Sequence, residues 1–368
     1  MTTSTQPLLN TTLAVYTPAV KLTQLTFSRF VAAMAIVVFH FKGGVLPVKV
    51  ESLTNFIGYF DVLVSYFFVL SGFILTVNYK QLVHVKQFYL NRFARIYPLY
   101  LFALVFTLLL VYNARTPNET IGFTKVFLNA SLLQAWFKQY VLTYNYPAWS
   151  LSVEAFFYLL FPYVMYLLQN KKITSQLFYI VLCWLAMQVA SMLMIVKGNY
   201  FILYHPLFHL STFLIGIAGG KLFMVRYALL VSNISKLELL SAAAVLVICY
   251  LIISKNIFFN TFYHNGFLAP VFVLFIYTIA LSNKRFFTSF NIRGLQYLGE
   301  ISYGIYILQI PVSILVYGLI DRTIHTSSTL SFYIFLTVLI CMSAITHECI
   351  EKPCRALIRK RFNKIPTS

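Results

Sequence analysis

Charged residues are scarce in this chain of 368 residues, of which only 10% are Asp, Glu, Lys or Arg. Soluble domains carry about 25% charged residues, so this scarcity argues against a water-soluble globular protein. Hydrophobic residues make up 60% of the chain and aromatic residues 18%, and the mean hydropathy is +0.79. Apolar runs of membrane-spanning length recur from end to end. The sequence therefore predicts an all-α polytopic membrane protein.

Several other features are missing. The five cysteines show no paired spacing, which argues against a disulfide or zinc framework. The first 20 residues are polar and threonine-rich and lack the basic start of a signal peptide. We see no internal repeat and no long water-soluble segment at either end. We predict a flexible tail over residues 1–20, a membrane domain over 21–355 and a basic cytoplasmic tail over 356–368.

Acidic residues are the scarcest charged type, with 9 Asp and Glu against 28 Lys and Arg, for a net charge of +19. In a soluble protein this excess would indicate a nucleic-acid partner, but in a membrane protein basic residues gather on the cytoplasmic side. We predict ten spans, near residues 27–45, 57–79, 96–112, 148–169, 175–196, 206–224, 237–254, 265–282, 301–320 and 329–350. With both termini in the cytoplasm, 20 of the 28 basic residues fall on the cytoplasmic side. Nucleic-acid binding is not needed to explain the charge.

The apolar segment 124–137 does not fit the pattern of spans. Its 14 residues are too few for an ordinary crossing. Counting it as a crossing would also place Lys171 and Lys172 outside. We therefore predict an interfacial or re-entrant helix on the far side of the membrane.

Two ionisable residues, Arg29 and His40, lie eleven positions apart in the first apolar stretch. On a helix this spacing is about three turns and roughly 16 Å, so both side chains share one face. Ionisable groups inside a span are costly and usually mark a functional site. The alternatives are a snorkelling anchor for Arg29 and a satisfied core histidine for His40.

A second basic pair, Arg92 and Arg95, follows the second span. At i, i+3 the two guanidinium groups form a fork on one helical turn, which suits phosphate groups. The alternative is anchoring to lipid headgroups. Within the second span, Ser71 and Gly72 permit close approach of another helix or of a slender ligand, and helix packing is the simpler explanation.

The fourth span contains one carboxylate, Glu154, with Tyr158 one turn later on the same face. A buried carboxylate needs a partner, and we expect a histidine or arginine from another helix. The alternative is a glutamate that only holds helices together.

Other polar residues near the ends of spans have simpler interpretations. His205 and His209 are spaced i, i+4 but lack a metal-binding signature, so we interpret them as interfacial histidines. Gly216 and Gly220 have the spacing of a helix-packing pair. Glu300 and Glu351 are expected at cytoplasmic helix ends, paired with nearby arginines.

Six motifs in order resemble the acyltransferase-3 family of integral-membrane O-acyltransferases. They are Arg-x10-His at 29–40, Phe-Phe-x-x-Ser-Gly at 67–72, Arg-x-x-Arg-x-x-Pro-x-Tyr at 92–100, Trp-Ser-Leu-Ser-Val-Glu at 149–154, Gly-Glu-Ile-Ser-Tyr at 299–303 and Glu-Lys-Pro at 351–353. Each motif is weak alone, but six at plausible spacing from about residue 22 to 355 are specific. One departure is Gln309, where many relatives carry histidine, and we assign Gln309 no catalytic role.

The resemblance implies transfer of an acyl group, often acetyl, from cytoplasmic acyl-CoA to a hydroxyl of a glycan, a glycolipid or another acceptor. It implies no metal and, with the tail composition, the inner membrane of a bacterium. We expect Arg92, Arg95 and Arg29 to hold the CoA phosphates and Ser71 to line the path of the acyl arm. We expect His40, Glu154 and Arg29 to be the catalytic residues, with His40 acting as general base.

Glu154 is expected to orient His40 and to stabilise its charged form, as the carboxylate of a catalytic triad does. An acyl-histidine intermediate remains open. Trp149, Ser152 and Tyr158 are expected to contact the acceptor. Ten helices with an intramembrane histidine and glutamate also suit a proton-coupled transporter, which is the main alternative. A structural or regulatory subunit is disfavoured by the number of ionisable groups in the spans.

Overall fold

The computed structural model describes residues 22–44, 51–79, 84–114, 121–256, 259, 262–282, 292–323 and 327–362. In this part of the chain all regular structure is helical, which confirms the predicted all-α fold. The longer helices are α1 (Thr23–His40), α3 (Leu63–Asn78), α4 (Val85–Ala114), α6 (Trp149–Leu168), α7 (Ile173–Val196), α8 (Pro206–Val225), α10 (Ile234–Ile253), α12 (Ala269–Leu281), α13 (Ile292–Thr323) and α14 (Ser328–Thr346). Short helices include α2 (Glu51–Ile57), α5 (Phe123–Ala130), α9 (Tyr227–Ser232) and α15 (Lys352–Phe362).

Each predicted span coincides with one of the ten longer helices. Within the described residues, eight helices are long and apolar enough to cross a membrane, and Gln24–His40 and Ala269–Leu281 are shorter apolar helices. The protein is thus an all-α polytopic membrane protein, while ten crossings and two cytoplasmic termini stay predictions. The third span begins earlier than predicted, because α4 starts at Val85 and contains the polar turn that carries Arg92 and Arg95.

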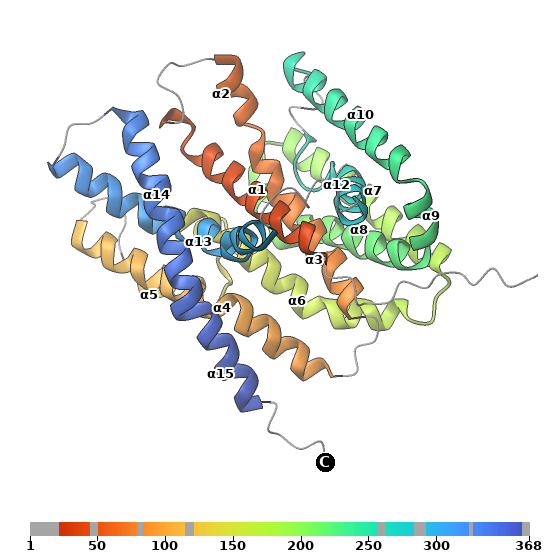
Figure 1. Ribbon diagram of the computed structural model, residues 1–368, viewed down its shortest axis with the longest axis horizontal. Helices are drawn as coiled ribbons and strands as arrows, with labels where there is room; N and C mark the ends of the chain where they lie inside the picture. The colour runs from red at the N-terminus through yellow and green to blue at the C-terminus, as the bar shows by residue number, and fades with distance from the viewer. Residues whose placement is uncertain are drawn as a thin grey trace, which may run out of the picture.

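The helices sort into buried and peripheral ones. Helix α13 packs against α1 and α3 packs against α8, so these four helices form the centre, while α14 covers α13 from outside. Helix α10 lies at one edge of the molecule, and α15, which follows α14, extends from the bundle at the lower end of the view (Figure 1). On α10, Leu239, Leu246 and Ile253 each expose more than 70% of their surface. An apolar face of this extent is typical of a helix in contact with lipid.

Glycines bring α3 and α8 into close contact. A Cβ atom added to Gly72 would lie 2.3 Å from the carbonyl oxygen of Phe213, and one added to Gly216 would lie 2.2 Å from that of Val69. At Gly220 the added atom would meet Thr76 at 2.8 Å. The predicted packing roles of these three glycines are therefore confirmed.

The 124–137 segment forms no spanning helix, as predicted. Helix α5 has eight residues, about 12 Å of rise, and ends before a turn in which Leu132 has φ 58°. The predicted start of the C-terminal tail at residue 356 falls inside α15, which continues to Phe362. Helix α15 follows α14 through a π-helical turn, His347–Glu351.

The predicted pairing of Glu351 with an arginine is confirmed by its contact with Arg355. Glu300 lies instead 3.7 Å from His347 and accepts a hydrogen bond from Gln296.

Candidate active site

Helix α1 connects two neighbouring cavities, which we name from the predicted topology. The inner pocket has a volume of about 400 Å³ and is lined by Arg29. The outer chamber has a volume of about 360 Å³ and is lined by His40. Because α1 is helical from Thr23 to His40, the eleven-residue spacing places both side chains on one face, as the sequence predicted.

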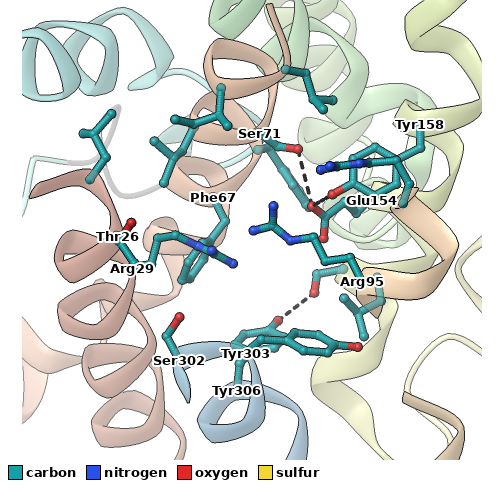
Figure 2. A pocket seen from close by; sticks show the side chains of 18 of the residues that line it. Thr26, Arg29, Phe67, Ser71, Arg95, Glu154, Tyr158, Ser302, Tyr303 and Tyr306 are labelled. Carbon is teal, nitrogen blue, oxygen red and sulfur yellow. Dashed lines mark hydrogen bonds between the residues drawn. The ribbon is translucent and has the colours of Figure 1, made fainter. Parts of the chain in front are cut away.

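The inner pocket is strongly cationic. Arg29 of α1 and Arg95 of α4 extend into it from different sides (Figure 2), and Arg92 also lines it. The guanidinium of Arg92 lies over the rings of Tyr79 and Tyr158, at 5.8 and 5.7 Å from their centroids. Its Nε atom is buried without a hydrogen-bond partner within the described structure. Three guanidinium groups at one cavity favour an anionic ligand.

Glu154 is the carboxylate of the inner pocket. Tyr158 donates a hydrogen bond of 2.5 Å to its Oε1 atom, and Ser71 donates one of 3.3 Å to the same atom (Figure 2). Arg29 interacts electrostatically with Glu154 and with Arg95. The pocket therefore carries one negative group against three positive ones.

The structure places Glu154 and His40, which we expected to pair, at different cavities and with different hydrogen-bond partners. The Nδ1 atom of His40 lies 2.7 Å from Oε1 of Gln309, the residue to which the sequence assigned no catalytic role. Gln309 is fully buried, and its Nε2 donates a hydrogen bond of 2.7 Å to the carbonyl of Tyr306. Because Nε2 is engaged as donor, Oε1 must face the imidazole and accept from Nδ1–H. A neutral His40 then keeps its Nε2 lone pair free, which is the form that a general base requires.

A proline in α13 helps to build this arrangement. Pro311 has no N–H group, so the carbonyl of Ile307, four residues earlier, lacks its helical donor. The side chain of Asn145 supplies a donor at 2.8 Å. This bond fixes the short 3₁₀ helix Tyr146–Ala148 against α13, and the ring of Tyr146 packs edge-on against His40 at 4.9 Å.

Aromatic and polar residues form the rest of the outer chamber. Trp149 packs against Tyr204 and His209, each with ring centroids 5.2 Å apart. His209, predicted to be interfacial, is 3% exposed and lines the chamber, with its Nε2 on the carbonyl of Leu203. Its Nδ1 is buried without a hydrogen-bond partner in the described part of the chain.

A carboxylate that the sequence reasoning missed, Asp61, also lines the outer chamber. Tyr263 donates hydrogen bonds to both of its oxygens, at 3.1 and 3.2 Å, and His264 Nδ1 lies 3.7 Å from Oδ2. Burial lowers the pKa of His264 below its ordinary value, and the charge of Asp61 opposes this shift. The sequence carries a signal for this residue, because Asp61 is the one acidic residue in the predicted span 57–79 and a buried acidic residue in a span usually marks a site.

The two cavities share part of their walls. Val64 of α3 and Tyr306 of α13 line both of them. The hydroxyl of Tyr306 lies 2.8 Å from the Oγ of Ser150 and 3.0 Å from the carbonyl oxygen of Pro147. We call Val64 and Tyr306 the partition.

The structure divides the predicted site residues into three groups. Arg29, Ser71, Arg92, Arg95, Glu154 and Tyr158 line the inner pocket, and His40 and Trp149 line the outer chamber. Ser152 lies in neither, since its buried hydroxyl donates to the carbonyl of Leu132. Among the described residues, no group of three or more His, Cys, Asp or Glu side chains could hold a metal ion.

Comparison with known proteins places the chain in a family. Residues 22–346 match the acyltransferase-3 family, described as an acyltransferase domain. The chain therefore belongs to the acyltransferase-3 family.

Two relatives illustrate the likeness. The chain is 25% identical over 332 residues to the O-acetyltransferase OatA of Staphylococcus aureus, which covers 82% of this chain and 54% of OatA. It is 30% identical over 156 residues to the acyltransferase MdmB of Streptomyces mycarofaciens, which covers 39% of each chain. The chain thus spans about half the length of OatA. No solved structure matches it.

Proposed function

We propose that this protein is a membrane O-acyltransferase that moves an acyl group from acyl-CoA to an acceptor hydroxyl. The observation that carries the proposal is a pocket with three arginines that shares a partition with a chamber holding a histidine. The family of the chain and the name of its relative OatA, an O-acetyltransferase, support this activity and favour acetyl as the group transferred.

The donor binds in the inner pocket. Arg29, Arg92 and Arg95 hold the phosphates of CoA, because guanidinium groups bind phosphate oxygens through paired, charge-assisted hydrogen bonds. Glu154 offsets part of the positive charge when the donor is absent, and its hydrogen bonds from Ser71 and Tyr158 fix one wall of the pocket. This role replaces the orientation of His40 that we had expected of Glu154.

The acyl arm of the donor crosses the partition between Val64 and Tyr306. Arg29 and His40 are about 16 Å apart along α1. The slim, extended acyl arm of the donor spans this distance, and the charged head of the donor stays at the arginines. The thioester then lies in the outer chamber beside His40. The acceptor enters the outer chamber from the end that lies away from the inner pocket.

Transfer follows from the tautomer that Gln309 fixes. The free Nε2 of His40 takes the proton of the acceptor hydroxyl while its oxygen attacks the thioester carbonyl. The carbon–sulfur bond breaks, and the CoA thiolate takes the proton from the imidazolium. In a two-step version the imidazole nitrogen itself receives the acyl group before the acceptor does.

The setting of the reaction follows the predicted topology. We propose ten crossings with both termini in the cytoplasm of a bacterium, so that the inner pocket opens to cytoplasmic acyl-CoA. The acceptor is a hydroxylated molecule such as a glycan or a glycolipid. The exposed apolar surface of α10 agrees with a place in the bilayer.

The first experiment measures release of CoA thiol and transfer of labelled acetyl by purified protein in detergent or nanodiscs. His40→Ala should lower transfer at least 100-fold, since removing a general base costs about 10²–10⁴. The same variant should bind CoA normally, because His40 does not line the inner pocket. Transfer close to that of the wild type would overturn the proposed role of His40.

The second experiment tests the donor site. The double variant Arg92→Ala/Arg95→Ala should raise the acyl-CoA KM by tenfold or more, because each charge-assisted hydrogen bond contributes about 1.5–3 kcal/mol. Arg226→Ala is the matched control, since Arg226 is exposed and lines neither cavity. An unchanged donor KM and kcat would contradict the phosphate role.

The same assay separates the enzyme from the alternative of a proton-coupled transporter. An enzyme releases free CoA thiol in proportion to acylated product. A transporter moves its cargo and leaves the thioester intact.

A further inference from the structure

The two cavities differ in charge. The inner pocket is lined by three arginines and one glutamate, which suits an anionic donor. The outer chamber is lined by Asp61 and, among the described residues, by no lysine or arginine. Lys42 is exposed and lies over the ring of Phe39, outside the lining. Lys125 and Lys138 line a separate cavity that shares only Leu142 with the outer chamber.

The chamber also offers unused hydrogen-bond acceptors. Asp61 accepts from Tyr263 and from the backbone N–H of Val62 and lies 3.7 Å from His264, and its side chain is still 25% exposed. The Nδ1 of His209 must be an acceptor in the neutral ring, because Nε2 donates to a carbonyl. The Oδ1 of Asn265 is likewise buried without a partner in the described structure. Both of these atoms have almost no accessible surface, so Asp61 is the acceptor of this wall that an O–H or N–H group of a ligand can meet.

Flat aromatic surfaces complete the chamber. Trp149, Tyr146, Tyr204 and Tyr306 line it, together with the imidazole of His40. The faces of aromatic rings are negative and attract the positive edges of other groups, including the C–H bonds of a saturated ring. A ligand with an apolar ring face and a rim of hydroxyls satisfies both kinds of wall. The volume of about 360 Å³ lies in the range of small-molecule sites.

We propose that the outer chamber selects an uncharged, hydroxyl-rich ring, such as a neutral glycosyl unit, over an anionic one, and that Asp61 imposes this selection. The inference rests on the proposed function and deepens it. One hydroxyl of the ring meets His40, and another donates to Asp61. A carboxylate or phosphate on the ring would face Asp61 with no lysine or arginine in the described lining to offset the repulsion.

The test uses two probes that share one ring, methyl β-glucoside and methyl β-glucuronide. They differ at C6, where the first carries a hydroxymethyl group and the second a carboxylate. Binding to the wild-type protein is measured by saturation-transfer NMR, and acylation by transfer from labelled acetyl-CoA. The glucoside should bind and react with a preference of about tenfold or more. Equal binding of the two probes, or a preference for the glucuronide, would overturn the proposal.

The variant Asp61→Asn isolates the charge, because it keeps the size of the side chain. It should raise the KM for the glucoside and reduce the preference between the probes to about twofold or less. The donor KM should stay unchanged, because Asp61 lies outside the inner pocket. Glu348→Gln is the matched control: it makes the same change of charge at an exposed residue that lines neither cavity, and it should keep the wild-type preference. A preference that survives in Asp61→Asn would contradict the role of Asp61.

The two readouts separate this inference from the proposed function. If the glucoside binds selectively but no acyl group is transferred to either probe, the acyltransferase proposal fails and the selectivity stands. If both probes are acylated equally, the selectivity fails and the acyltransferase stands.

Discussion

The contact between Gln309 and His40 leads to a prediction that can be worked out in detail. Oε1 of Gln309 lies 2.7 Å from Nδ1 of His40, and Nε2 is held by the carbonyl of Tyr306. In Gln309→Leu the apolar side chain has similar size but accepts no hydrogen bond. A buried N–H left without a partner costs about 1–3 kcal/mol. The imidazole then shifts toward the tautomer with its proton on Nε2, which cannot take a proton from the acceptor.

The free-energy cost of the lost hydrogen bond sets the expected decrease in kcat. Since about 1.36 kcal/mol is a factor of ten in rate, Gln309→Leu should lower kcat by about 5- to 150-fold. Gln309→Asn keeps the amide but is one methylene shorter, so its kcat should fall between those of Gln309→Leu and the wild type. The donor KM should not change in either variant, because Gln309 does not line the inner pocket.

The assay is release of CoA thiol at saturating acyl-CoA, normalised to folded protein. Gln176→Leu is the control: its buried amide bonds to the carbonyls of Leu168 and Lys171, and Gln176 lines neither cavity. It should lower the thermal midpoint and leave kcat per folded molecule unchanged. A Gln309→Leu protein with the kcat of the wild type would refute the argument from the tautomer.

Three further predictions concern a helix contact, a buried hydrogen bond and the partition. Gly216→Ala should lower the thermal midpoint in detergent, because the new Cβ would lie 2.2 Å from a backbone oxygen of Val69, whereas Gly318→Ala, with nothing within 4 Å, should not lower it. Ser152→Ala should lower stability by about 1 kcal/mol through one lost hydrogen bond and leave the acceptor KM unchanged; a raised KM would restore Ser152 as an acceptor contact. Tyr306→Phe removes the hydroxyl that anchors the partition and should raise hydrolysis of acyl-CoA without acceptor several-fold; unchanged hydrolysis would show that the hydroxyl does not seal the partition.

The helices and their packing residues could be predicted from the sequence because they depend on local patterns. Apolar runs placed the ten helices, and the spacing of Gly216 and Gly220 indicated a contact between helices. The helical repeat alone placed Arg29 and His40 on one face. Each of these properties is set by neighbours within a few turns.

The partners of the site residues could not be predicted in the same way. His40 and Gln309 are 269 positions apart, and no local pattern records which helix faces α1 at that depth. Glu154 was paired with His40 because a buried carboxylate needs a partner, but Tyr158 and Ser71 already supply hydrogen bonds. Such contacts depend on how the whole bundle packs.

The chamber residues were missed for a different reason. Asp61 lies in a long apolar run, which we interpreted only as a span, and His209 was predicted to lie near the membrane surface. A single polar residue in an apolar run is a candidate site residue, as a motif is, because the cost of its burial must be compensated by a partner.

The length and rotation of helix α1 set the position of His40 relative to Arg29. Inserting one residue between Arg29 and His40 would turn the imidazole by about 100° and lift it about 1.5 Å, away from Gln309. An insertion of seven residues would nearly restore the direction but displace the group by about 10 Å. A change in the length of α1 therefore alters both the direction of the imidazole and its distance from the donor phosphates.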